Sequence, residues 1–516
     1  MLTLRPNART CLASCLVGLL ASCNGSSGGG SPAPAPALTV KTQLPAPGST
    51  VAIDTAVTLV FAADPEPDPA TLTAAALQVA DGAGPLPGSH QYDATTRTWT
   101  WIPSRELPRG ARLTASVADS VRSLEGGRLA AAVSWDFHVR AGVPASPVTL
   151  ATGVVTSALG PPSLYVSTLD NGDAMVVAGS QSWDWTSSGV SAPLTVPGSA
   201  VHGFHLDAAG EAVVVTLNGG LGVGVPINSA TRSFGSPWSA SQTIFSSGGG
   251  HPLSAKLSVN AAGDRMLYVP IGFTSPTHSR HYVVWASGAS PSAWQTSPSS
   301  LATFVSTVVL TELDGTGKVA TLRRDGTFLI AERHDRAEGT MQVYTVAQGS
   351  VSPMGLMASD DGTLRAVWRD VGITRQSFAA PGSSFGVPTD VPVFLPNTTN
   401  WRVAPSGALL GWGGTQAVRS AASSAEWSET TLAAQPLAGA ISPRGEAVFI
   451  YFRLPNELML LRWRPGELID PPLLIATVNG PFVAFRDGAI TVDEVGRVTV
   501  AFVPNSPGDL IGVRIE

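Results

Sequence analysis

An internal repeat constrains this chain more than any other feature of its sequence. From residue 165 onward, a short apolar stretch, a turn that contains glycine and a second apolar stretch recur eight times. The turn glycines, 38 to 54 residues apart, are Gly172, Gly210, Gly263, Gly317, Gly362, Gly407, Gly445 and Gly496. Repetition at this period indicates that each repeat is one supersecondary unit whose apolar face is buried by its neighbours.

The repeats predict a β-propeller over residues 142–516. Each one continues with a third apolar stretch, such as "LMLLRW", and a more variable fourth, such as "WSETTLA". Four short strands at this spacing are typical of a propeller blade. We count eight blades, and a count of seven stays open because the longer intervals are irregular. The last repeat stops after its third strand, so we expect the unpartnered stretch "PVTLATG" (147–153) to complete that blade and cover its edge.

Residues 38–141 read as a separate antiparallel β-sandwich. The stretches "AVTLVFA", "RTWTWIP", "RLTASVA" and "VSWDFHVR" alternate apolar and polar residues between turns rich in glycine and proline. Several such strands in about a hundred residues favour two packed sheets.

The order of landmarks in this segment resembles the SbsA-type bacterial Ig-like domain. The landmarks are Pro45 to Gly48, Asp54-Thr55 with Phe61, Asp68 to Leu72, Trp99 to Pro103, Leu107 with Gly110, and Trp135 to Phe137. The resemblance implies a β-sandwich that acts as a spacer or binding unit, and no catalytic residues come with it.

The N-terminal segment predicts export and a lipid anchor. Arg5 and Arg9 precede the apolar stretch "CLASCLVGLLA", as in a secretory signal. The residues Leu20-Ala21-Ser22-Cys23 resemble the lipobox of bacterial lipoproteins. The resemblance implies a signal peptide at 1–22, cleavage between Ser22 and Cys23, and acyl chains on Cys23 that hold the protein on a membrane. Asn24 is not the aspartate that retains such proteins at the inner membrane, so we expect the outer membrane.

Residues 23–37 predict a tether, because glycine and serine give flexible coil and the Pro-Ala run gives an extended spacer. The chain has three cysteines, all at or before Cys23, so the body beyond the tether must be stable without disulfides. No stretch after Leu20 is apolar over the length that a membrane-spanning helix needs.

The charge of the chain argues against nucleic acid as a partner. The net charge is -6, and only three lysines occur. Removal of residues 1–22, which hold Arg5, Arg9 and no acid, leaves 29 bases against 37 acids, or -8. The most basic stretch, "LRRDGTFLIAERHDRAEG", interleaves its arginines with acids, so it predicts a self-neutralising surface and not a phosphate-binding stripe.

Few side chains suggest a site. Trp183 and Trp185 in "SQSWDWTSS" could stack on sugars while Asp184 binds hydroxyl groups, but packing between blades is the favoured interpretation. Neither the pair His202 and His205 nor the pair His278 and His281 has the converging ligands that zinc requires, and we expect the second pair in an exposed loop.

The acids Asp64, Glu66 and Asp68 suggest calcium, but the prolines between them hinder wrapping around an ion. We therefore expect no metal, no cofactor and no catalytic residue.

Taken as a whole, the sequence predicts a lipid-anchored envelope protein with a non-enzymatic binding or scaffolding role. The repeats are loosely similar to those of β-propeller lectins and sialidase-like proteins, which implies a carbohydrate or protein ligand at the propeller face. One alternative is a glycan hydrolase whose acid pair lies among Asp184, Asp370 and Asp390. Another is an accessory subunit of an envelope assembly complex.

Overall fold

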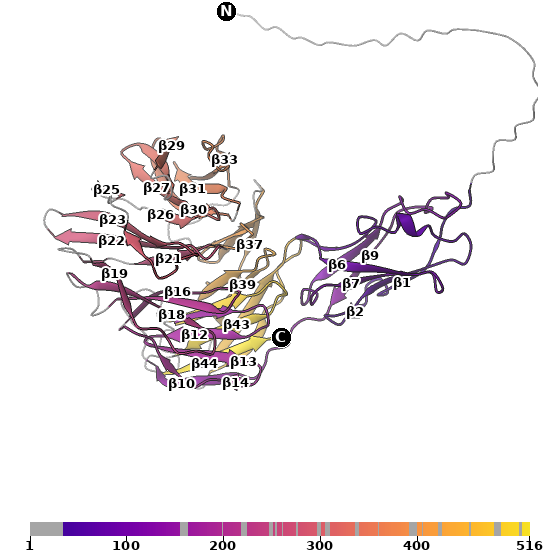
Figure 1. Cartoon of the computed structure of the whole chain (residues 1–516), viewed down its shortest axis with the longest axis horizontal. Coiled ribbons are helices and arrows are strands. Elements are labelled where there is room, and N and C mark those ends of the chain that lie inside the picture. The colour runs from indigo at the N-terminus through magenta and orange to yellow at the C-terminus, as the bar shows by residue number, and fades with distance from the viewer. Residues whose placement is uncertain are drawn as a thin grey trace, which may run out of the picture.

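The computed structural model divides into two β-rich units (Figure 1). It describes residues 35–154, 164–198, 200–217, 224–246, 251–252, 255–260, 262–274, 277–296, 301–304, 310–335, 340–359, 361–391, 400–404, 406–421, 426–453, 456–478, 487–504 and 508–516. The first unit extends from one side of the larger second unit, and the C-terminal end of the chain lies near the place where they meet.

The first unit consists of two sheets. One sheet has the strand order β1 (Val40–Leu44), β3 (Val57–Phe61), β7 (Thr98–Pro103), β6 (Gly88–Asp93). The other has the order β2 (Thr50–Val51), β9 (Val133–Val139), β8 (Arg112–Val117), β4 (Leu77–Asp81), β5 (Gly84–Pro85). A single turn of 3-10 helix, η1 (Pro69–Thr71), lies between β3 and β4.

The alternation seen in the sequence explains the core of the first unit. Along β3, Val57, Leu59 and Phe61 are buried and the residues between them are partly exposed. Trp99 and Trp101 alternate in the same way along β7, and both are fully buried. Because successive side chains of a strand point to opposite faces, each sheet buries one face against the other. The four strands expected here are confirmed as β3, β7, β8 and β9.

The second unit contributes eight sheets from the part of the chain that the structure describes, one for each repeat, numbered here in chain order. The first holds β11 (Leu164–Thr168), β12 (Ala174–Ala178), β13 (Gln181–Thr186), β14 (Gly189–Val190) and β15 (Leu194–Thr195). The second holds β16 (Ala200–Leu206), β17 (Glu211–Leu217), β18 (Pro226–Ser233) and β19 (Gln242–Ser246). The third holds β20 (His251–Pro252), β21 (Lys256–Val259), β22 (Arg265–Thr274), β23 (Thr277–Ala286), β24 (Gln295–Thr296) and β25 (Leu301–Phe304). The fourth holds β26 (Leu310–Leu313), β27 (Val319–Asp325), β28 (Phe328–Asp335) and β29 (Thr340–Gln348).

The remaining sheets follow the same antiparallel order. The fifth holds β30 (Val351–Ala358), β31 (Leu364–Asp370), β32 (Ile373–Ala379) and β33 (Thr389–Asp390). The sixth holds β34 (Asn400–Val403), β35 (Leu409–Gly413), β36 (Gln416–Ser420) and β37 (Ser428–Thr431). The seventh holds β38 (Ala438–Ile441), β39 (Ala447–Arg453), β40 (Glu457–Trp463) and β41 (Leu473–Thr477). The eighth holds β42 (Asp487–Val492), β43 (Val498–Val503) and β44 (Gly508–Ile515), joined at its edge by β10 (Val148–Val154).

The repeated turn has a backbone reason for its glycine. The eight turn glycines have φ between 77° and 88°, a left-handed conformation that other residues adopt only at a cost. In several turns a side chain three residues earlier accepts backbone N–H groups. Asp314, for example, accepts from Thr316 N at 2.9 Å and from Lys318 N at 2.8 Å. The repeat thus marks a tight turn between the first two main strands of each sheet.

The eighth sheet takes its last strand from the start of the second unit. β10 pairs antiparallel with β44, with Thr149 opposite Ile511. The pairing expected for residues 147–153 is therefore confirmed, and it covers the edge that the shortened last repeat leaves.

Apolar contacts join the sheets. β11 contacts strands of the second and eighth sheets, and β38 contacts strands of the sixth and eighth. One buried cluster combines Leu150 of β10 with Leu164 of β11 and Val503 of β43, so the first and last repeats share a core. Within the described residues, no helix is long and apolar enough to cross a membrane.

Candidate functional site

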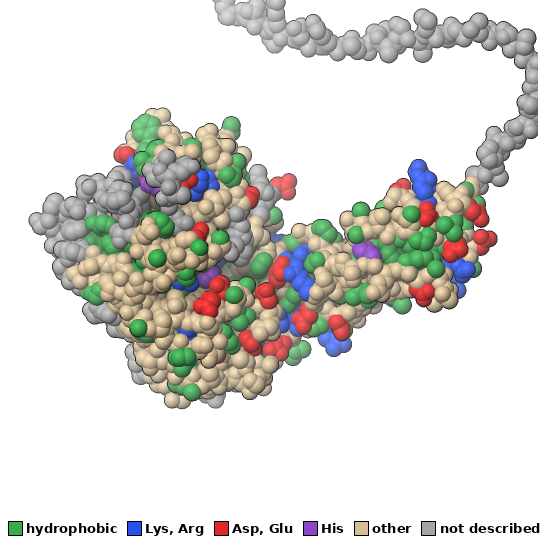
Figure 2. All heavy atoms as spheres, viewed as in Figure 1, with side chains coloured by type: hydrophobic (Ala, Val, Ile, Leu, Met, Phe, Trp, Pro, Cys, Tyr) green, Lys and Arg blue, Asp and Glu red, His purple; other side chains and the backbone are tan. Residues whose placement is uncertain are grey.

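The two units are held together by a bidentate ion pair. Arg444, in the turn between β38 and β39, donates to the Asp81 carboxylate from Nε at 3.0 Å and from Nη2 at 2.6 Å. Nη2 also donates to the carbonyl of Gly84 at 3.1 Å. Two parallel bonds fix orientation as well as distance, so one guanidinium positions the β4–β5 turn of the first unit. Figure 2 shows charged side chains gathered where the units meet.

Close backbone packing completes this junction. A Cβ atom at Gly82 would lie 1.8 Å from the carbonyl oxygen of Pro465, so the contact excludes any side chain at residue 82. Nearby, Arg109 N donates to Val495 O at 3.1 Å, and Arg105 pairs with Glu494. The first unit is therefore seated on turns of the seventh and eighth sheets.

A groove of about 600 Å³ lies beside the junction and is the best candidate for a binding site. Its volume is within the range of small-molecule sites. Its walls come from the first unit and from the sixth, seventh and eighth repeats, and they comprise Gly82, Ala83, Ser406, Ala408, Arg419, Ser420, Ala421, Glu426, Trp427, Ser428, Pro443, Arg444, Gly445, Pro465, Gly466 and Glu494.

The groove combines cations, hydroxyl groups and one indole ring. The Arg419 guanidinium lies 4.3 Å from the ring centre of Trp463 and donates from Nη1 to the Trp463 carbonyl at 2.8 Å. Burial lowers the pKa of Arg419 to about 10, so the side chain is still charged at neutral pH. Trp427 is partly exposed and precedes β37. This mixture suits a polar ligand with an apolar face, such as a sugar.

A second hollow, of about 460 Å³, also lies at the junction and shares Glu494 with the groove. Its lining includes the turns of the first and eighth sheets, but its main charges are already paired. Arg105 pairs with Glu494, and Arg497 Nε donates to Asp493 at 2.6 Å. We therefore treat this hollow as part of the interface between the units.

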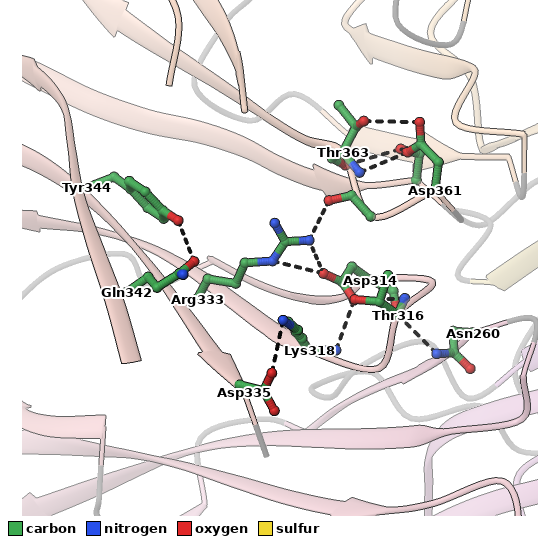
Figure 3. A network of polar contacts seen from close by, with 12 residues as sticks. Asn260, Asp314, Thr316, Lys318, Arg333, Asp335, Gln342, Tyr344, Asp361 and Thr363 are labelled. Atoms are coloured by element: carbon green, nitrogen blue, oxygen red, sulfur yellow. Dashed lines mark hydrogen bonds and ion pairs between the residues drawn. The ribbon is translucent and has the colours of Figure 1, made fainter. Parts of the chain in front are cut away.

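The turns of the second unit are linked by a buried polar network (Figure 3). Arg333 of β28 donates from Nε to the Asp314 carboxylate at 3.1 Å, and its Nη2 also contacts that carboxylate and the carbonyl of Gly362 in the next sheet. Asn260 of the preceding turn donates from Nδ2 to the Asp314 carbonyl at 3.0 Å. Arg333 and Asp314 are almost fully buried. One ion pair thus joins the turns of the third, fourth and fifth sheets.

Other buried arginines repeat this arrangement. Arg462 of β40 donates from Nη1 to Glu446 at 2.9 Å and to the carbonyl of Gly496 in the eighth sheet at 2.8 Å. Arg232 of β18 contacts Asp184 of the first sheet, and both side chains are buried. These charges hold neighbouring sheets together and are not available to a ligand.

The tryptophans considered as a sugar platform belong to the interior. Trp183 and Trp185 lie on β13 and are 1% and 5% exposed. Trp185 packs over the Arg514 guanidinium at 4.4 Å and fills the space above Gly512 of β44. The preferred prediction, packing between sheets, is confirmed, and the stacking platform is wrong because the rings are not accessible.

The histidine pairs considered in the sequence lie on strands of the second and third sheets. His202 and His205 lie on β16, and burial lowers the pKa of both, that of His205 to about 4. The exposed loop expected around His278 and His281 is wrong, because both residues lie in β23. The His281 ring is buried, and its Nδ1 is 2.5 Å from the Tyr268 hydroxyl.

Of the three acids proposed for a hydrolase, Asp184 lies apart from the other two, on the first sheet. Asp184 is paired with Arg232 in the interior, as described above. Asp370 and Asp390 lie on the fifth sheet, where Arg375 is between them at 3.3 and 3.4 Å. These two carboxylates therefore lie around one guanidinium, outside the groove described above.

Two sets of sequence candidates remain. Asp68 caps η1 by accepting the Ala70 N–H at 2.9 Å. Among the residues that the structure covers, Asp64, Glu66 and Asp68 do not form a group that could hold a metal ion, and no other set of three or more such side chains does. Ser22 and Cys23, with the signal peptide and most of the tether, lie outside the described residues.

Sequence reasoning missed the groove. Arg444 and Asp81 are 363 positions apart, so no local pattern links them. Trp427 lies in the variable fourth stretch of its repeat, where aromatic residues are expected for packing alone. Only a comparison of equivalent positions among the repeats could have singled out side chains of this region.

Among the comparisons with known proteins, a family model matches the first unit. A search of curated proteins gave no match. Similar solved structures include the polysaccharide lyase Uly1, with 9% identity, a TM-score of 0.36, and coverage of 70% of this chain and 90% of that chain. They also include an auxiliary nutrient binding protein from Bacteroides thetaiotaomicron, with 10% identity, a TM-score of 0.30, and coverage of 93% and 98%. Residues 35–139 match the family model of the bacterial Ig-like domain, in agreement with the two-sheet sandwich found there.

Proposed function

We propose that this protein is a lipid-anchored, non-enzymatic binding protein of the bacterial cell envelope. In this proposal the eight sheets form an eight-bladed propeller, and the groove beside the Ig-like domain binds a carbohydrate. Three features support the propeller: one glycine turn per sheet, apolar contacts between the sheets of consecutive repeats, and the pairing of β10 with β44.

The groove is the observation that carries the binding role. It has the volume of a small-ligand site and places an indole ring beside the guanidinium of Arg419 and the hydroxyl groups of Ser420 and Ser428. The buried acids that could serve catalysis are instead paired with arginines between the sheets. Recognition without chemistry is the role that this distribution of charges favours.

The groove predicts a loss of sugar affinity when its indole is removed. Trp427→Ala is expected to weaken the best binder from a glycan panel about tenfold, the change that corresponds to roughly 1.4 kcal/mol. Isothermal titration of the full-length protein measures the affinity. Trp294→Ala is the matched control, because Trp294 is also partly exposed but lies outside the groove. Equal affinity in both variants would contradict the site, and turnover of the bound glycan would favour the hydrolase alternative.

The lipid anchor has its own test. Cys23→Ala is expected to move the protein from the membrane fraction to the soluble fraction, because a diacylglycerol thioether requires a thiol and each buried methylene contributes about 0.8 kcal/mol to membrane binding. Fractionation of cells, followed by mass spectrometry of the N-terminal peptide, measures the change. Cys15→Ala is the control and should stay on the membrane. If Cys23→Ala also stays there, the anchor lies elsewhere.

A further inference from the structure

The groove beside the junction contains one charge that the protein itself does not pair. Among the residues that the structure describes, four charged side chains line this groove. Arg444 and Glu494 form ion pairs with residues of the first unit, and Glu426 has an interaction within the chain. Arg419 forms no ion pair with a described residue, and its one hydrogen bond to such a residue runs from Nη1 to the Trp463 carbonyl. Arg419 is 7% exposed, so a buried cation lines the groove without a contacting counter-charge.

The acids that act on Arg419 from a distance bind other arginines. Glu446 accepts from Arg462 Nη1 at 2.9 Å, and a carboxylate oxygen of Glu467 lies 3.8 Å from Arg464 Nη1. Burial lowers the pKa of Arg419 more than these two acids raise it, to about 10, so the guanidinium is charged at neutral pH. A buried cation without a direct partner lowers the stability of the fold, and an anionic group bound in the groove would offset that cost.

The guanidinium of Arg419 is held in one orientation before any ligand binds. It lies 4.3 Å from the ring centre of Trp463, and Nη1 donates to the carbonyl of the same residue at 2.8 Å. Because the guanidinium is planar and rigid, fixing one corner and one face also fixes the direction of its remaining N–H groups. A side chain that is already ordered loses little conformational freedom when it binds an anion.

The neighbouring strand places a hydroxyl group beside this cation. Arg419 of β36 and Ser428 of β37 are directly opposite each other in the sixth sheet. Opposite residues point to the same face of a sheet, with Cβ atoms about 4.5–5.5 Å apart. Ser428 is exposed, and both residues line the groove, which has a volume of about 600 Å³. A single ligand in the groove can therefore contact the guanidinium and the hydroxyl group together.

We propose that the groove selects an acidic sugar and that Arg419 determines this selectivity by binding the carboxylate or sulfate group of the sugar. The remaining N–H groups of the guanidinium donate to the anion, and Ser428 donates to the anion or to a sugar hydroxyl group. A neutral sugar of the same shape leaves the cation without a counter-charge, so it binds less tightly. This selectivity rests on the proposed sugar-binding function and narrows the class of ligand.

Isothermal titration of the full-length protein with glucuronate, glucose 6-sulfate and glucose tests the selectivity, because the three sugars differ in the anionic group. At least one acidic sugar is expected to bind the wild type about tenfold more tightly than glucose, and the tighter one identifies the anion. Arg419→Gln should lose this advantage and keep its affinity for glucose. Equal affinity of the wild type for all three sugars, or an advantage retained in Arg419→Gln, would overturn the role of Arg419.

A second variant keeps the test decisive if Arg419→Gln does not fold. Ser428→Glu places a carboxylate opposite Arg419, so it should pair with the guanidinium and remove the advantage of the acidic sugars. Thr431→Glu is the matched control, because it adds the same charge to an exposed position of β37 outside the groove, and it should keep the advantage. An equal effect of the two variants would contradict a specific role for Arg419.

The failure of this selectivity is distinguishable from the failure of the sugar site. Binding of glucose as tight as that of the acidic sugars would overturn the selectivity and leave the sugar site standing. Binding of none of the three sugars would also overturn the selectivity, whereas the glycan panel and Trp427→Ala decide separately whether the groove binds a sugar.

Discussion

Replacing Arg333 with methionine is expected to lower the free energy of unfolding by about 3–5 kcal/mol, because the change leaves the Asp314 carboxylate buried without its counter-charge. Asp314 is 0% exposed, and its Oδ2 accepts from the guanidinium alone among the described donors. The substitution also removes the donor to the Gly362 carbonyl, so the fourth and fifth sheets lose a direct link. Urea unfolding followed by circular dichroism measures the loss.

A double-mutant cycle separates the pair from the packing of the arginine stem. Asp314→Asn keeps a carbonyl oxygen for the Thr316 and Lys318 N–H groups and removes the charge. The double variant with Arg333→Met contains neither charge, so it should be more stable than the sum of the two single losses implies. Arg453→Met is the matched control. Its ion pair with Glu457 at 2.6 Å is exposed, and exposed pairs contribute at most about 1 kcal/mol. A loss at Arg333 no greater than this control would contradict the structural role of the network.

Features of the fold that depend on local pattern are predictable from the sequence. The alternation along "AVTLVFA" and "RTWTWIP" predicts strands with one buried face, and the structure has them as β3 and β7. The turn glycines predict one turn for each sheet, since a left-handed backbone excludes most other residues. Even the pairing of β10 with β44 follows from a shortened last repeat and an unpartnered strand.

The site depends on contacts that no local pattern encodes. Asp81 and Arg444 belong to different units, and their bidentate pair exists only because the β4–β5 turn is seated against the β38–β39 turn. In the sequence, Asp184 between two tryptophans resembles an acid that binds sugar hydroxyl groups. In the structure its carboxylate forms a buried ion pair with Arg232 of the next sheet. Tertiary partners decide whether a polar residue is structural, and the sequence does not show those partners.

Arg365, a buried arginine of β31, is unusual in a way that the sequence shows only in part. Its position is recorded in the sequence, because aligning the eight repeats on their turn glycines places it among uncharged residues. The sequence does not show whether a buried arginine has a carboxylate partner. Arg333 and Arg462 are also buried, and both have one. An internal repeat therefore provides its own reference for unusual residues, and the structure shows which of the described arginines pair with a carboxylate.

A disulfide between β10 and β44 is expected to raise the stability of the second unit by about 5 kcal/mol, because it closes a very long loop and so restricts the unfolded chain. Thr149 and Ile511 are opposite each other in the pair; Thr149 is exposed, and Ile511 is partly buried at the edge of a core cluster, so Thr149→Cys with Ile511→Cys removes only part of one apolar contact. Facing residues of antiparallel strands have Cα atoms about 4.5–5.5 Å apart, which suits a disulfide. With Cys23 replaced by alanine, the chain beyond residue 22 has no competing thiol.

Thermal unfolding of the oxidised and reduced forms of this one protein gives the comparison. The oxidised form should unfold at a higher temperature, and dithiothreitol should return it to the value of the Thr149→Cys single variant. Failure of the disulfide to form would show that β10 does not rest beside β44 in solution. A disulfide that forms without stabilising the protein would show that the bridge strains the pair of strands enough to offset its effect on the unfolded chain. Stabilisation of the expected size would instead support β10 and β44 as paired strands, since only a bridge that fits the native geometry keeps the full entropic gain.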